Sequence, residues 1–143
     1  MEKVLKKSEL RIEARNEVGI MAGIAALMAV SGVNIDNFCA YNSHEKSIIN
    51  LLTSDNVKAR KALEGKGYKI EEREVVVLHL WNRPGALSAV AGKIRDSGIN
   101  LESVYGTSTP GGERTAIVFL SEDNARVSEI FDDMVVAAAD QTV

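Results

Sequence analysis

The sequence predicts an α+β fold made of two βαββαβ units, each with an antiparallel sheet and both helices on one face. The first observation is an internal repeat with an offset of 66 residues. Its matched pairs are Asn16/Asn82, Gly19/Gly85, Ala25/Ala91, Ser31/Ser97, Gly32/Gly98 and Asn34/Asn100. The second is a period-2 alternation ahead of each copy, with Leu10, Ile12 and Ala14 matching Val76, Leu78 and Leu80. The repeat covers nearly all 143 residues, so we expect one unit over 1–73 and another over 74–143.

In the first unit the alternation predicts a strand over Ser8–Arg15, and an apolar run predicts a helix over Val18–Ser31 that ends at Gly32. Ser54 or Asp55 is a suitable cap for a second helix that runs to about Glu64. The other expected strands are Val33–Tyr41, Lys46–Thr53 and Tyr68–Arg73, with turns at Asn42–Glu45 and Gly65–Gly67.

The second unit repeats this order. The expected elements are a strand Val75–Leu80, a helix Pro84–Ser97, strands Ile99–Thr107 and Arg114–Leu120, a turn at 110–112, and a helix from about Asp123. Val135–Ala139 fits either a last strand or a helix extension, and we favour the strand. The order gives the ferredoxin-like arrangement, which many functions share, so function has to be argued from sites.

Composition excludes several classes of function. The chain is 45% hydrophobic, enough to bury a core, and its net charge of −3 argues against a nucleic-acid partner. It has no apolar segment long enough for a membrane span and no signal core, and a single cysteine, Cys39, so we expect a cytoplasmic protein. No spacing of His, Cys, Asp or Glu predicts a metal, cofactor or catalytic site, so we do not expect an enzyme.

The stretch "WNRPGALSAVAGKIRDSGIN" (residues 81–100) carries the most chemical information. Asn82 is placed to cap a helix, Pro84 suits a first helical turn, and Gly85 allows close approach of the backbone. The free N–H groups of Gly85, Ala86 and Leu87, aided by the helix dipole, could hold a carboxylate. The alternative is that these residues only start a helix.

These residues resemble the opening of the ACT domain, a small amino-acid-binding regulatory module. Its pattern of an acidic or amide residue, x-Pro-Gly-x-Leu, a helix and Gly-(Ile/Val)-Asn is matched by Asn82, Pro84, Gly85, Leu87, Gly98 and Asn100. The order of elements is similar in both units. The chain therefore resembles a free-standing tandem ACT protein without a catalytic domain.

The resemblance implies that a small zwitterion or carboxylate, such as an amino acid, binds at the seam between ACT units. The implied ligand-binding residues are Asn82, Pro84, Gly85, Ala86, Leu87 and Asn100 in the second unit, with Asn16, Gly19, Ile20 and Asn34 in the first. An amide can both donate and accept hydrogen bonds, which suits a zwitterion. Val18 replaces the proline and Glu17 replaces Arg83 in the first unit, so we expect the site around Asn82 to bind better.

The first helix of the first unit is apolar on nearly all sides, with Leu27 and Val30 where the second unit has Lys93 and Asp96. Such a helix is usually buried on both sides. We therefore predict a homodimer interface through Gly23, Ala26, Leu27 and Val30. Three functions stay open: a sensor that binds an amino acid, a regulatory interaction subunit with vestigial ligand sites that acts on a partner enzyme, and, least favoured, an enzyme.

Overall fold

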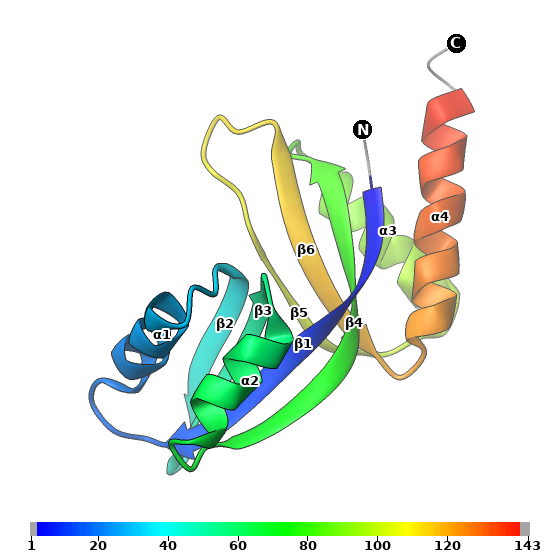
Figure 1. The fold of residues 1–143 in the computed structure, drawn as a ribbon. Helices are drawn as coiled ribbons and strands as arrows, with labels where there is room; N and C mark the ends of the chain where they lie inside the picture. Colours follow the sequence, from blue (N-terminus) through cyan, green and yellow to red (C-terminus); the bar gives the residue numbers. More distant parts are fainter. Residues whose placement is uncertain (1–2, 141–143) are drawn as a thin grey trace. The chain divides into compact units, whose positions relative to one another are not determined.

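The computed structural model describes residues 3–140 of the chain, and the side chains of residues 3–135. The chain forms two compact units: Ser8–Arg73, the first unit, and residues 1–7 together with 74–143, the second unit. Two long strands, β1 (Lys3–Arg15) and β4 (Lys69–Trp81), each contribute one part to each unit (Figure 1). The expected α+β fold of two ferredoxin-like units is confirmed.

The first unit contains α1 (Ile20–Val30), β2 (Ile35–Ser43), β3 (Lys46–Thr53) and α2 (Asn56–Glu64) besides its parts of β1 and β4. Its strand order is β2-β3-β1-β4, and β3 pairs antiparallel with both β1 and β2. The alternate residues of β1 and β3 that face the helices build the core with α1 and α2. That core consists of Leu10, Ile12, Ile24, Met28, Val33, Ile49, Leu51, Ala59 and Leu63.

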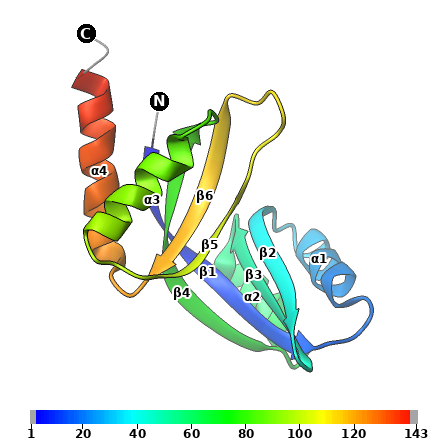
Figure 2. The ribbon, with the colours of Figure 1, turned by 180° about the vertical axis from the view of Figure 1, so that it is seen from behind.

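The second unit contains α3 (Ala86–Asp96), β5 (Leu101–Thr107), β6 (Arg114–Ser121) and α4 (Asn124–Asp140). Its strand order is β1-β4-β6-β5, and β6 pairs antiparallel with both β4 and β5. Helices α3 and α4 lie next to each other (Figure 2). The core consists of Val76, Leu78, Leu80, Val90, Ile94, Ile117, Phe119, Val127, Ile130 and Phe131.

The preferred assignment of Val135–Ala139 to a last strand was wrong, because α4 continues as a helix to Asp140. The buried side chains of Val127, Ile130 and Phe131 recur at helical spacing, and Met134 packs against the same core. The strand after α4 is not needed, because β1 is the neighbour of β4 and Val4 packs against this core. The charged segment at the start of the chain, which forms the first part of β1, therefore occupies the place where the repeat predicts a last strand of the second unit.

Both first helices begin two residues later than expected. The N-cap residues are Gly19 and Gly85, with φ of 89° and 87°, and neither helix has a side-chain cap. Positive φ is easy for glycine and costly for other residues, so the helix can start only after it. The prediction that Asn82 caps the helix was therefore wrong, whereas Asp55 does cap α2 by accepting a hydrogen bond from the N–H of Lys58.

Among the residues that the structure describes, no helix has the length and apolar character needed to cross a bilayer.

Candidate functional site

Asn82 ties the end of β4 to the loop between β5 and β6. Its backbone N–H donates to the carbonyl of Glu113 at 2.9 Å, and its Nδ2 donates to the carbonyl of Gly112 at 3.0 Å. Asn16 does the same in the first unit, donating from its N–H to Glu45 at 2.9 Å and from Nδ2 to His44 at 3.2 Å. Each asparagine therefore fixes a hairpin loop and leaves its side-chain oxygen as the acceptor available to a ligand.

An open cavity of about 640 Å³ lies beside the start of α3. We call it the α3 cavity. Its lining comes from the end of β4, the first turn of α3, β5 and β6. The lining includes Trp81, Asn82, Arg83, Ala86, Leu87, Val104, Gly106 and Thr107. The cavity therefore contains three of the residues expected to bind a ligand: Asn82, Ala86 and Leu87.

The backbone of Gly106 forms part of this wall. A Cβ placed on it would lie 2.7 Å from the carbonyl oxygen of Ala116 and 3.1 Å from Ile117 on the paired strand β6. A contact of that length with backbone requires the strands to move apart. Only glycine therefore fits at this point of β5.

Arg83 is the one charged side chain among the residues that line the α3 cavity. The N–H groups of Leu87 and Ser88 belong to the first turn of α3, where no acceptor exists within the helix. The N–H of Ala86 is already used by the carbonyl of Arg83 at 3.2 Å. A cationic side chain and an unused helix N–H that belong to residues lining the same cavity favour an anion.

The equivalent cavity of the first unit, the α1 cavity, is about half as large, at about 310 Å³. Ile20 and Tyr41 line it where the second unit has Ala86 and Thr107. The larger side chains occupy space that is open in the α3 cavity. Glu17 stands in place of Arg83 and brings a negative charge to the same start of a helix.

The structure does not bring the two predicted asparagines of a unit together. Asn82 precedes α3 and Asn100 follows it, and a helix of 11 residues is about 16 Å long. Asn100 donates its N–H to Glu122 at 3.5 Å, and Asn34 donates its side-chain amide to Asp36 at 2.6 Å. Both lie outside the two cavities, as do Asn16, Pro84 and Gly85, whereas Gly19 and Ile20 line the α1 cavity.

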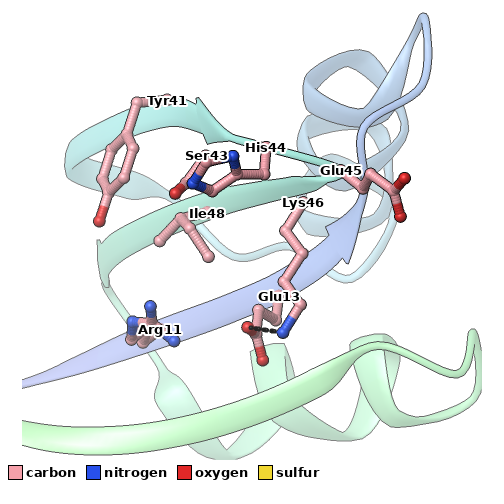
Figure 3. Close-up of a pocket in the computed structure, with 8 residues that line it drawn as sticks. All are labelled: Arg11, Glu13, Tyr41, Ser43, His44, Glu45, Lys46 and Ile48. Carbon is pink, nitrogen blue, oxygen red and sulfur yellow. Dashed lines mark hydrogen bonds and ion pairs between the residues drawn. The ribbon is translucent and has the colours of Figure 1, made fainter.

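A third cavity lies in the first unit, over β1, β3 and the end of β2 (Figure 3). Two of its lining residues, Lys46 and Glu13, form an ion pair, with Nζ 3.0 Å from Oε1. This hydrogen bond, with the nearby charges of Lys46, Lys69 and Arg11, holds the pKa of the Glu13 carboxyl below its ordinary value of 4.5. Both signs of charge are thus present and partly neutralise each other, so this cavity does not favour an anion as clearly as the α3 cavity.

The residues expected at a dimer interface lie on α1. Gly23, Ala26 and Val30 are exposed, Val30 to 89%, whereas Leu27 is partly buried against the core of the first unit. Three of the four therefore form an uncovered apolar strip on this helix.

Several lining residues of the α3 cavity were not predicted, above all Trp81, Val104 and Thr107. They belong to β4 and β5, which are brought to the cavity by the pairing of each strand with β6. No local motif marks Trp81 or the residues of β5 as part of a binding site. The available signal was a large apolar residue, Val104, on β5, which is an edge strand of the sheet.

No group of three or more His, Cys, Asp or Glu side chains within the described residues could hold a metal ion. No curated protein matches the chain in sequence. Residues 74–135 match the ACT domain family. The start of this match coincides with the start of the main segment of the second unit, and it includes every residue of the α3 cavity.

Solved structures show the same fold over almost the whole chain. A protein from Bacteroides thetaiotaomicron is 22% identical, with a TM-score of 0.83 over 92% of this chain and 90% of its own. The ligand-free regulatory subunit of aspartate kinase from Thermus thermophilus is 15% identical, with a TM-score of 0.66 over 91% and 95%. Escherichia coli aspartokinase III in complex with lysine and aspartate is 14% identical, with a TM-score of 0.54 over 92% of this chain and 32% of its own.

The family match, the cavity at the turn that carries the family pattern and the repeated fold agree with one another. Residues 74–135 form an ACT domain with the element order βαββα, and Ser8–Arg73 repeats that order and adds a last strand within the same chain.

Proposed function

We propose that this protein is a regulatory sensor that binds an amino acid, or a closely similar carboxylate, in the α3 cavity. The observation that carries the proposal is that Arg83 and Leu87, whose N–H is unused in the first turn of α3, line the same open cavity of about 640 Å³. The ACT match of this segment supports a regulatory role. Two similar structures are named as a regulatory subunit of aspartate kinase and as an aspartokinase with bound lysine and aspartate.

The proposed mechanism is a shift between states of the protein that bind the ligand with different affinity, which is the only way a ligand can change a conformational equilibrium. A ligand that also contacted Asn100 would have to lie between two ACT units, because Asn82 and Asn100 flank opposite ends of α3. That seam between units stays a prediction. We expect no catalytic turnover and a cytoplasmic location.

The exchange of charge between the two cavities provides the test. Arg83→Glu places in the α3 cavity the charge that Glu17 brings to the α1 cavity. In a thermal-shift screen of the amino acids, we expect at least one to raise the melting temperature of the unaltered protein. Calorimetry should then give a dissociation constant at least about ten times higher for Arg83→Glu, because an attractive charge becomes a repulsive one.

Arg11→Gln is the matched control, because it removes a positive charge from the cavity of Figure 3 and leaves the α3 cavity unchanged. Binding should be the same as in the unaltered protein. The proposed site would be contradicted if Arg83→Glu and Arg11→Gln lost the same amount of affinity for the amino acid, or if the amino acid bound Arg83→Glu with full affinity.

The second candidate function is that of an interaction subunit that acts on a partner enzyme while its cavities bind nothing. The uncovered apolar strip of α1 favours it. Absence of any melting shift across the amino acids, together with retention of the protein by a partner enzyme, would support this function in place of the first.

A further inference from the structure

The α3 cavity has an apolar wall that faces solvent. Trp81, Leu87 and Val104 are 39%, 50% and 43% exposed, and all three line this one cavity. Large apolar side chains that gather at a cavity indicate a binding surface for an apolar group. Covering them would recover roughly 25 cal/mol for each Å² removed from water. The α1 cavity has no large apolar residue exposed in this way except Tyr41, which carries a hydroxyl group.

The charges at the cavity define the polar end of its ligand. Among the lining residues Arg83 is the one charged side chain, and no carboxylate is present. One negative charge on a ligand therefore has a partner. A ligand ammonium would have only neutral oxygens, such as the side-chain oxygen of Asn82 or the hydroxyls of Thr107 and Ser108.

Trp81 does not compensate for the missing carboxylate. The guanidinium carbon of Arg114 lies 3.7 Å from the centre of the Trp81 ring, so a cation of the protein already covers one face of that ring. A positive group of a ligand near this ring would be repelled by Arg114. Trp81 is therefore suited to contact an apolar group of a ligand and not an ammonium group.

We propose that the α3 cavity selects monocarboxylates with a bulky apolar side chain, and that an α-ammonium group is not required for binding. The inference rests on the proposed function and names the ligand class of that site. Apolar amino acids and the 2-oxo acids with the same side chains belong to this class. The second ammonium group of lysine would lose water without gaining a partner among the lining residues. Aspartate lacks an apolar side chain that would cover Trp81, Leu87 and Val104.

Calorimetry with the full chain tests the inference. The probes are leucine, 4-methyl-2-oxopentanoate, phenylalanine, phenylpyruvate, lysine and aspartate. We expect the four apolar carboxylates to bind. The dissociation constant of each 2-oxo acid should lie within about ten-fold of that of the amino acid with the same side chain. Lysine and aspartate should bind at least ten times more weakly than leucine, a difference of about 1.4 kcal/mol.

Val104→Thr is the informative variant, because it keeps the β-branched shape of an exposed residue on β5 while replacing a methyl group by a hydroxyl. It should raise the dissociation constants of leucine and 4-methyl-2-oxopentanoate about three- to ten-fold. The circular dichroism spectrum should stay the same, which would show that the fold is unchanged. Phe38→Thr is the matched control, because Phe38 is the repeat equivalent of Val104, is exposed to 57% and does not line the α1 cavity. It should leave both ligands unaffected.

The outcomes separate the inference from the proposed function. Lysine or aspartate binding as tightly as leucine, and lost in Arg83→Glu, would overturn the apolar class and keep the site. Leucine binding without any binding of 4-methyl-2-oxopentanoate would overturn the statement on the ammonium. If none of the six probes binds, the apolar class is wrong, whereas the proposed function is overturned only if no amino acid of the thermal-shift screen binds.

Discussion

Arg83 and Glu17 show how a single position of the repeat changes the chemistry of a site. Both precede a helix whose N-cap is a glycine in the left-handed conformation, and both line a cavity. The backbone of the two turns is alike, so the charge and the volume of the neighbouring side chains set the difference. The sequence predicts this difference in charge, and the two cavities also differ in volume, at about 640 and 310 Å³. Better binding at the site around Asn82 stays a prediction.

Glu9 is fully buried, and Arg73 places an Nη 2.8 Å from its Oε1. Removing Arg73 takes a hydrogen-bonded opposite charge away from a carboxylate that is shielded from water. We expect Arg73→Met to lower the free energy of unfolding by about 3 kcal/mol, measured by urea denaturation.

Arg60→Met is the control for this prediction. Arg60 pairs with Glu64 at 3.0 Å and Glu72 at 3.7 Å, but all three side chains are exposed to solvent. Exposed pairs contribute little, so a loss below about 1 kcal/mol is expected. Similar losses in Arg73→Met and Arg60→Met would show that burial of Glu9 is not what makes its pair important.

At the scale of elements, α1 and α3 are copies with different outer faces. Helix α3 carries Lys93, Arg95 and Asp96 on its exposed side, whereas α1 carries Ala26, Ala29 and Val30. An exposed apolar face on a helix costs hydrophobic free energy unless it is covered. This difference is the basis for the expected homodimer.

We expect the protein to be a dimer at micromolar concentration by light scattering. Ala26→Glu, which brings a charge to the exposed face of α1, should weaken dimerisation at least about ten-fold. Ala89→Glu on the exposed face of α3 should have no effect, since that helix already presents charges. A monomeric unaltered protein would contradict this prediction.

Most strands and helices could be predicted, because apolar spacing and glycine positions determine them locally. The exceptions are instructive. Helix α3 starts only after Gly85, because the φ of Gly85 is 87°. The sequence Asn82-Arg83-Pro84 ahead of it does not reveal this conformation. The lining by Trp81 and Val104 depends on pairing with β6, which is a contact between segments distant in the sequence.

At the scale of the whole molecule, β1 and β4 determine how the repeat is built. Residues 3–7 group with 74–143, and the half-buried Val4 packs against the core that contains Leu78 and Phe131. We propose that the first residues of the chain complete the second unit. The first unit is then an insertion between two segments of the second.

Val4→Ala tests this organisation. Loss of two methyl groups from a partly buried site should lower the free energy of unfolding by roughly 1 kcal/mol. In a spectroscopic unfolding experiment, the loss should appear in the transition reported by Trp81, the single tryptophan of the chain, which lies in the second unit. Lys3→Ala, at an exposed position of the same strand, should change nothing. An unchanged Trp81 transition in Val4→Ala would mean that residues 3–7 do not support the second unit.

The sequence by itself determined the two units, their α+β class, the turn at Asn82 and the difference between Arg83 and Glu17. These follow from local periodicity and from residues that occupy equivalent places in a repeat. Only the tertiary structure decided that Val135–Ala139 remains helical, that Asn82 holds a loop instead of a helix, and that Asn100 lies away from the cavity. Each of these depends on which distant segment lies alongside, because strand pairing and core packing select among conformations that the local sequence allows equally well.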